Sequence, residues 1–481
     1  MSAAGTFWPR LNSPGQMQQQ TDGLPTPRRY LAILAVSCGT AMSVIDSYMP
    51  AVALPTLARD LNVAPSSAVL LVTVYQLVLV MTVLPFSALG DRIGLRRLYQ
   101  CGQLTFAAAS LLFFFAKSLP FLLVVRGIQA VGAAAMLSVS SALVRSIYPA
   151  NQLGRGIGIN IIVVSSAGAL APTVGGLILS VADWPWIFMA AAPLALISLW
   201  IGQKALPETP PTPHDEPYDV LAAVLCALTF GLVISGLESA VHGDSPVVSV
   251  AIIVAGAVIG FLFVRRELTE KKPILPVDLL VSRVMGLSVA GGLMAFVASM
   301  TMMLSLPFRL QEVYGFTPGE VGAVLSPWPF GAMLTAPLAG VLSDRVPAGL
   351  LSGIGMMFTA VALLLIGYLP ADATHVDIGW RMALAGSGFG LFLASNARLI
   401  VGSAPRERAA SAGGLVSTVR LTGQTLGATL AATLLALHLG GGRTPALVAA
   451  GLALLAGLCS VARLGPALRK PAPDESGPLG G

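Results

Sequence analysis

Charged residues are scarce in this chain. Asp, Glu, Lys and Arg together make up 10% of its 481 residues, whereas about a quarter of a typical soluble domain is charged. Hydrophobic residues make up 55%, and the mean hydropathy is +0.81. This composition excludes an ordinary soluble domain and predicts an integral membrane protein. The apolar runs are about 20 residues long and do not alternate with polar residues, which favours membrane-spanning helices.

Cysteine is also rare, and the sequence signatures of common catalytic sites are missing. The four cysteines lie in or beside apolar runs without CxxC spacing, so we expect buried free thiols. The chain has no phosphate-binding loop, zinc-ligand spacing or nucleophile elbow. We therefore expect no enzyme activity, no cofactor and no metal site.

Long apolar runs broken by glycine, proline and charge predict an all-α membrane protein with fourteen transmembrane helices. With both termini in the cytoplasm, 21 Lys and Arg residues fall on the cytoplasmic side and 5 on the outer side. This excess is typical of cytoplasmic loops, so we attribute the net charge of +6 to topology rather than to nucleic-acid binding. The expected helices are 31–55, 67–89, 98–116, 120–143, 156–180, 185–203, 220–240, 247–264, 284–310, 320–342, 348–369, 378–402, 409–437 and 444–464.

The predicted helices fall into two halves of six, separated by an insert and flanked by polar tails. Linkers rich in proline and charge surround the two inserted helices. The expected segments are a cytoplasmic tail at 1–29, an N-terminal half at 30–204, linkers and inserted helices at 205–283, a C-terminal half at 284–465 and a second cytoplasmic tail at 466–481.

The two halves carry matching short loops after their second helices. One reads Asp91-Arg92-Ile93-Gly94, and the other reads Asp344-Arg345-Val346-Pro347. Internal repeats of this kind build many secondary transporters. A basic loop that only fixes orientation is the alternative. We expect a gate at the cytoplasmic side formed by Asp91, Arg92, Gly94, Arg97, Asp344 and Arg345.

Two charged residues lie inside expected helices of the first half. Asp46 falls near the bilayer midplane, where a charged side chain costs roughly 2.5–3.5 kcal/mol or more. Such a residue persists mainly where a water-filled path or a partner requires it. Arg126 lies among small residues that allow close helix packing. It is either a structural cation bonded to backbone carbonyls or the partner of a proton-carrying carboxylate.

Other carboxylates are expected nearer the membrane surface. Glu238 and Glu312 fall near outer ends of predicted helices, where interfacial exposure is expected. Asp46 is therefore the one acidic residue that we expect to lie deep.

The fifth expected helix combines glycines with a proline, at Gly168, Pro172, Gly175 and Gly176. Proline kinks a helix and leaves backbone groups able to pair in two arrangements, which suits a moving element. Ordinary glycine-mediated packing is the alternative.

Several further residues are candidates for the wall of a central cavity. Methionine suits promiscuous apolar surfaces, although a lipid-facing stripe is the alternative for the methionines of the ninth helix. Arg420 lies about 18 Å along the thirteenth helix at 1.5 Å per residue, and both anchoring and site lining are open for it. The cavity candidates are Tyr48, Gln129, Met300, Trp328, Phe392, Asn396 and Arg420.

These motifs, in this order, resemble those of the major facilitator superfamily. The likeness covers about residues 30–465 and is greatest to the fourteen-span drug:proton antiporter branch of the EmrB/QacA type. Ala51 and Leu95 depart from the pattern, which usually has a polar and a basic residue there. The resemblance implies two six-helix halves around a central cavity, with two helices appended. It also implies roles in proton coupling for Asp46 and Arg126.

The expected function is a proton-coupled antiporter that exports lipophilic drugs or toxic compounds, cations among them, by alternating access. The proton gradient supplies the energy, and the location is a bacterial inner membrane. The expected partners are a small-molecule substrate, protons and the lipid bilayer, with no nucleic acid and with a periplasmic adaptor left undecided. An importer, a narrow exporter of a metabolite or siderophore, and a membrane sensor or scaffold are the alternatives.

Overall fold

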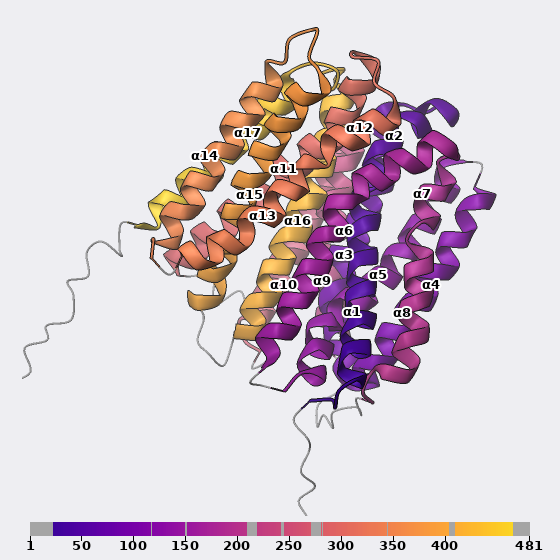
Figure 1. The fold of residues 1–481 in the computed structure, drawn as a ribbon, viewed down its shortest axis with the longest axis vertical. Coiled ribbons are helices and arrows are strands. Elements are labelled where there is room, and N and C mark those ends of the chain that lie inside the picture. Colours follow the sequence, from indigo (N-terminus) through magenta and orange to yellow (C-terminus); the bar gives the residue numbers. More distant parts are fainter. Residues whose placement is uncertain are drawn as a thin grey trace, which may run out of the picture.

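The computed structural model describes residues 23–464 except 117, 150–151, 209–218, 242–244, 271–279, 281, 344 and 404–408. Within these residues it contains helices and loops but no strand. The helices run side by side in an elongated bundle (Figure 1). Internal hydrogen bonding along each helix satisfies the backbone, which is what a segment surrounded by lipid requires.

The helices between Arg28 and Ala205 form the N-terminal group of the bundle. Two of the expected helices are interrupted, one at Met49 and one at Ala190–Ala191. The elements are α1 (Arg28–Tyr48), α2 (Pro50–Asp60), α3 (Pro65–Ile93), α4 (Leu95–Leu112), the 3-10 turn η1 (Phe113–Phe115), α5 (Leu119–Ile147), α6 (Leu153–Val181), α7 (Pro185–Met189) and α8 (Ala192–Ala205).

The C-terminal group repeats this plan with one interruption, at Ser326, where Pro327 begins a new helix. Its helices lie at the left of Figure 1. They are α11 (Arg283–Glu312), α12 (Pro318–Leu325), α13 (Pro327–Leu342), α14 (Ala348–Gly367), α15 (His375–Ser403), α16 (Ala409–Ala436) and α17 (Thr444–Ala462).

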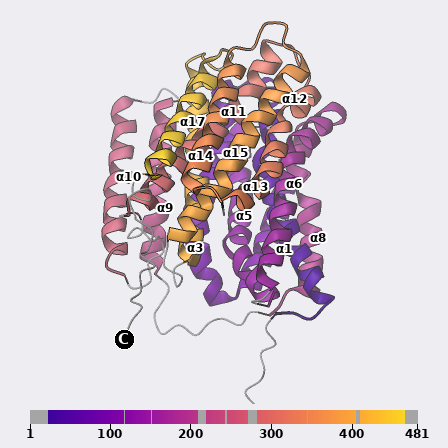
Figure 2. The same cartoon turned by 60° about the vertical axis from the view of Figure 1, so that its left-hand side comes forward.

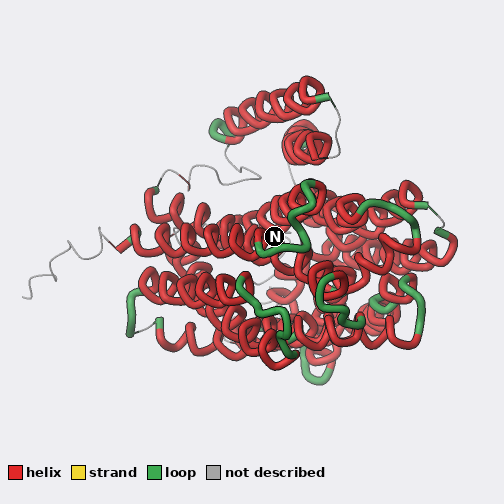
Figure 3. The backbone as a smooth tube through the Cα atoms, turned by 90° about the horizontal axis from the view of Figure 1, so that it is seen from above, coloured by secondary structure: helices red, strands yellow, loops and turns green. Residues whose placement is uncertain are grey.

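A helical hairpin separates the two groups in sequence, formed by α9 (Val220–Val241) and α10 (Pro246–Glu267). It stands at the edge of the bundle in Figure 2, and Figure 3 shows one helix pair lying outside the rest. α9 packs on α3 and α16. Only 17% of the most apolar stretch of α10 is buried, against 67% for α11. An apolar helix with so little burial is suited to contact lipid.

Twelve helical segments in the described part of the chain are long and apolar enough to cross a membrane. Fourteen were expected from the sequence. Every expected range lies on one helix or on consecutive helices of the structure, but α6 and α16 are not among the twelve. The fold is therefore an all-helical membrane bundle in which twelve described segments are both long enough and apolar enough to span a membrane.

Contacts between the two groups involve α3 with α16 and α6 with α12 and α13. We call the end of the bundle where α2 and α12 lie the upper end, as in Figure 1. There, Arg59 donates a hydrogen bond to Gln311 (3.1 Å), and Gln311 donates to the carbonyl of Val52 (3.3 Å). These bonds hold the groups together at the upper end.

Candidate functional site

Asp46 and Arg126 form an ion pair inside the N-terminal group. The Arg126 Nη1 atom lies 2.8 Å from each carboxylate oxygen of Asp46. The arginine and aspartate side chains are 0% and 1% exposed. Burying either charge alone would cost several kcal/mol, so each residue makes the other tolerable at this depth. Both residues were expected to be linked to the same carboxylate chemistry, and the structure brings them together.

Pro50 leaves a backbone carbonyl free to accept a second hydrogen bond from the arginine. Proline has no N–H, so it cannot donate to the carbonyl of Asp46 four residues earlier. The Arg126 Nη2 atom donates to that carbonyl instead, at 2.8 Å. The Nε atom donates to the carbonyl of Leu71 at 3.2 Å. Arg126 therefore joins α5 to α1 and α3 through both backbone and carboxylate oxygens.

Aromatic rings enclose the ion pair. The guanidinium carbon of Arg126 lies 4.0 Å from the ring centre of Tyr75 and 5.2 Å from that of Phe188. Gln129 accepts a hydrogen bond from Arg126 and donates to the hydroxyl of Ser110 at 2.9 Å. Gln129 was expected in a cavity wall, but it is fully buried within this network. The sequence analysis missed Tyr75 because one tyrosine in an apolar run carries no signal of its own.

Gln76, the next residue along α3, is fully buried. Neither of its amide atoms has a hydrogen-bond partner in the part of the chain that the structure describes. A buried polar group left without a partner costs about 1–3 kcal/mol. This residue was not identified from the sequence.

Arg420 lies on α16 opposite α1, and its side chain is partly exposed. Among the described residues it makes neither a hydrogen bond nor an ion pair, and the titratable side chains that face it are those of Tyr48 and Tyr75. One turn later, Gln424 donates to the Tyr48 hydroxyl at 3.4 Å. Tyr48 is also partly exposed. Of the seven cavity candidates, these two are the ones that are partly exposed.

The glycines of α6 form close contacts in this structure, and their expected role in a conformational change stays a prediction. A Cβ atom added to Gly175 would lie 2.7 Å from Cγ of Met49, and one added to Gly176 would lie 2.8 Å from the carbonyl oxygen of Pro318. One added to Gly168 would lie 3.3 Å from Val44. α6 stays helical through Pro172. These residues therefore allow α6 to pack closely on α1 and, across the two groups, on α12.

The loop after α3 lies at the lower end, opposite α2 and α12. Gly94 has a φ of +98°, which favours glycine, and its N–H caps the helix at the carbonyl of Gly90. Asp91 and Arg97 are exposed, and Arg92 is partly exposed.

The corresponding loop of the C-terminal group follows α13. Asp344 lies outside the described residues, and Arg345 is exposed. Arg398 of α15 donates to Ser343 at 2.5 Å, which ties this loop to its own group. The expected gate role of both loops stays a prediction.

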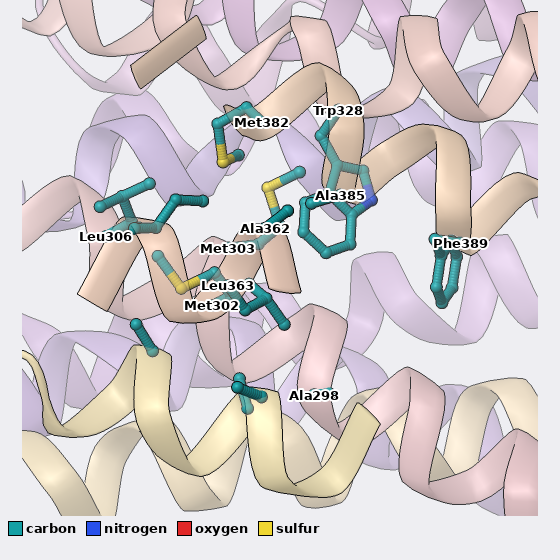
Figure 4. Close-up of a cluster of buried hydrophobic side chains, with 14 of the residues drawn as sticks. Ala298, Met302, Met303, Leu306, Trp328, Ala362, Leu363, Met382, Ala385 and Phe389 are labelled. Carbon is teal, nitrogen blue, oxygen red and sulfur yellow. The ribbon is translucent and has the colours of Figure 1, made fainter. Parts of the chain in front are cut away.

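The remaining cavity candidates lie in packed interiors. Met300, Trp328 and Phe392 are 2%, 3% and 0% exposed, so they do not line open space in this state. Figure 4 shows Trp328 near Met303 of α11 and Met382 of α15, and Phe389 belongs to the same hydrophobic cluster. Asn396 is also buried, and its amide oxygen accepts a hydrogen bond from Arg463 at 2.7 Å. The apolar side chains fill the core of the C-terminal group, while Asn396 anchors the end of α17.

Glu238 corrects the expectation that the other acidic residues are exposed. It lies near the end of α9 but is only 9% exposed. Its carboxylate accepts a hydrogen bond from Thr429 of α16 at 2.6 Å. Glu312, by contrast, is exposed as expected. The sequence placed Glu238 at the right depth but could not show that α16 covers it.

Comparison with known proteins identifies this architecture. The family model described as Major Facilitator Superfamily matches residues 36–428 and 287–480. The chain is 44% identical to the uncharacterized transporter YebQ of Escherichia coli K12 over 86% of this chain and 91% of that protein. It is 27% identical to the riboflavin transporter RibZ of Clostridioides difficile, covering 83% and 87% of the two chains.

Further relatives and solved structures agree. The methyl viologen resistance protein SmvA of Salmonella typhimurium is 27% identical, with 83% of this chain and 81% of that protein covered. A crystal structure of a POT family transporter with 5-aminolevulinic acid superposes with a TM-score of 0.70 at 16% identity, over 92% and 97% of the chains. The chain is a membrane transporter rather than an enzyme, and it belongs to the major facilitator superfamily.

Proposed function

We propose that this transporter is a proton-coupled antiporter that exports lipophilic drugs or toxic compounds by alternating access. The observation that carries this proposal is the buried Asp46–Arg126 ion pair at 2.8 Å within the spanning helices. A carboxylate in such a place can exist charged, held by arginine, or neutral, after binding a proton. The two states differ in local charge, which is what coupling to a proton gradient requires.

The carboxylate can change its charge without losing its position. Protonation of Asp46 weakens its attraction to Arg126 but leaves the guanidinium bonded to the Asp46 and Leu71 carbonyls. A proton taken up from one side and released to the other would bias the equilibrium between two conformations, since each would favour one protonation state.

We also propose a fourteen-span topology with both termini in the cytoplasm. α6 and α16 contain 29 and 28 residues. At 1.5 Å per residue each is more than 40 Å long, which exceeds the roughly 30 Å of a bilayer core. The lower-end loops carry most of the Lys and Arg residues, and this favours the cytoplasmic side for that end.

On this orientation, the structure corresponds to a state closed towards the outside. The bonds of Gln311 with Arg59 and Val52 and the contact of Gly176 with α12 all lie at the upper end. Export then requires these contacts to separate so that the substrate leaves at the upper end.

The nature of the substrate is proposed from the relatives. The methyl viologen resistance protein and the multidrug efflux pump LfrA of Mycolicibacterium smegmatis, both 27% identical, support drug export. The similarly distant riboflavin transporter favours a second candidate, the transport of one metabolite. In the described structure no unpaired carboxylate faces Arg420, so a cationic substrate would find no acidic partner there. A preference for cations therefore receives no support from the site.

Dye accumulation in bacterial cells that express the chain tests this function. A panel should include cationic, neutral and acidic lipophilic dyes, together with riboflavin, each with and without a protonophore. We expect lower accumulation of at least one dye, reversed by the protonophore. Asp46→Asn should abolish the effect. Asp60→Asn, which neutralises an exposed carboxylate of α2, should preserve it.

Two results would contradict the proposal. If Asp46→Asn cells still export at the full rate under the same gradient, proton coupling does not pass through this residue. If only riboflavin responds and no dye does, the narrow metabolite transporter is the correct function.

A further inference from the structure

We infer that the substrate carries an anionic acid group, such as a carboxylate, which pairs with Arg420. This inference rests on the proposed transport function and specifies the class of compound that the site accepts. It starts from an imbalance of charge between the two groups of helices, at the level where α1 and α16 face each other.

The direction of the Arg420 side chain follows from its neighbours on α16. Val419 faces α11, where its Cγ1 atom would lie 3.0 Å from a Cβ added to Gly292. Leu421 packs into the hydrophobic cluster of the N-terminal group. Thr429, nine residues on and therefore on the opposite face of the helix, meets α9. Arg420 thus points between α11 and α3, towards α1.

The acidic residues on the surrounding helices cannot neutralise Arg420. Asp46 of α1 is bound by Arg126 through both carboxylate oxygens. Glu312 lies at the upper end of α11, and Asp91 lies at the lower end of α3. Glu238 bonds to the opposite face of α16. In the described part of the chain, Arg420 therefore carries a positive charge without a counter-ion.

A cation at this depth is costly unless a partner or a water-filled path accompanies it. The ion pair of Asp46 and Arg126 is neutral overall, so Arg420 gives this level of the bundle a net charge of about +1, because arginine stays protonated in proteins. A substrate with a negative charge would remove the imbalance, whereas a cationic substrate would increase it. The charge therefore selects for acids.

The groups beside Arg420 also suit an acid. A guanidinium can bind two carboxylate oxygens at once. The Tyr48 hydroxyl accepts a hydrogen bond from Gln424, which leaves its own proton available for donation. Tyr48 and Arg420 come from opposite groups of helices. An acid group held by both would join the two groups, and its departure would release them.

Binding to the purified protein tests this inference. The probes are dansyl-alanine, which has a free carboxylate, and its methyl ester, which is neutral. Their fluorescence is titrated with the full-length protein in phosphatidylcholine nanodiscs without a pH gradient. We expect the acid to bind at least about tenfold more tightly than the ester, the effect of one charged hydrogen-bonded contact.

Variants at Arg420 separate charge from folding. Arg420→Gln should lower affinity for dansyl-alanine about tenfold and leave affinity for the ester unchanged. Arg420→Lys keeps the charge and should retain a preference for the acid. Arg443→Gln, which removes an exposed charge at the start of α17, should match the wild type.

Several outcomes would overturn the inference. These are equal binding of acid and ester by the wild type, equal losses for both probes in Arg420→Gln, or binding of ethidium in preference to both. Loss of the acid preference in nanodiscs that contain phosphatidylglycerol would assign Arg420 to a lipid headgroup instead. Asp46→Asn should abolish gradient-driven transport but keep the acid preference, so failure of coupling and failure of anion recognition are distinguishable.

Discussion

Asp46 and Arg126 depend on each other unequally. The aspartate has the arginine as its ion-pair partner, whereas the arginine also bonds to two carbonyls and to Gln129. Removing the arginine therefore leaves a buried carboxylate without a counter-ion, while removing the aspartate charge leaves an arginine with several hydrogen bonds. The consequences for stability should differ accordingly.

We expect Arg126→Met to destabilise the protein by about 3–5 kcal/mol, the usual cost of breaking a buried ion pair from one side. The double variant Asp46→Asn/Arg126→Met should recover part of this loss, because no unpaired charge remains. Thermal unfolding of the purified wild type and of both variants in detergent measures the difference. A double variant no more stable than Arg126→Met would show that the hydrogen bonds, not the charge, hold the site.

Substitution of Gln76 should have the opposite effect on stability. Its buried amide has no partner in the described residues, so Gln76→Leu should stabilise this state by about 1–3 kcal/mol. Gln103→Leu is the matched control, because Gln103 is equally buried but donates to Ser198, and it should destabilise. The melting temperatures of the two purified variants measure these effects. If Gln76→Leu lowers it, the amide has a partner that stabilises this state.

Among the individual residues of the candidate site, the sequence predicted the charged ones better than the uncharged ones. A charge within an apolar run is an energetic anomaly, which is why Asp46, Arg126 and Arg420 were found. Tyr75 and Gln76 were missed because their contacts depend on which face of α3 meets α5. Met300, Trp328 and Phe392 were expected at a cavity but are buried, since the same residue types also fill cores.

Close packing of α6 on α12 is the main feature at the scale of elements. Gly176 of α6 approaches the first turn of α12 so closely that a side chain would meet the backbone of Pro318. The opposing backbone can move only with its helix. Whatever widens this contact should therefore shift the protein towards a state open at the upper end.

We expect Gly176→Val to raise the population of that open state. Modification of Gln311→Cys by a membrane-impermeant maleimide measures it, in a background where the four native cysteines are serine. Labelling should be several-fold faster, because Gln311 bonds across the closed upper end. Gly451→Ala is the control, since a Cβ there meets nothing within 4 Å. Unchanged labelling would show that α12 does not seal this end.

Element positions followed from the length of the apolar runs, but helix breaks did not. The expected helix at 31–55 is divided at Met49, just before Pro50. Pro172 also lies within a helix, yet α6 continues through it. The sequence alone does not distinguish these two prolines. The three-dimensional pairing of α6 with α12 was likewise invisible in either helix alone.

For the whole molecule, the asymmetry of basic loops predicts orientation. Cysteines introduced at Arg59, in the last turn of α2, and at Arg97, in the first turn of α4, lie at opposite ends of the bundle. In intact cells, an impermeant maleimide should label Arg59→Cys and not Arg97→Cys. In permeabilised cells the maleimide should label both variants. Labelling with the reverse pattern would place the lower end outside and would contradict the proposed cytoplasmic position of both termini.

The break before Pro50 has a consequence for how a proton could move the protein. Arg126 donates hydrogen bonds to two kinds of oxygen of Asp46. In the proposed mechanism the carboxylate would bind the proton, while the main-chain carbonyl would keep α1 bonded to α5. Neutralising the acid therefore need not dismantle the N-terminal group. The group can rock as a single body, because the sensing atom and the fastening atom are different atoms. Pro50 separates the two tasks by leaving that carbonyl without a backbone donor.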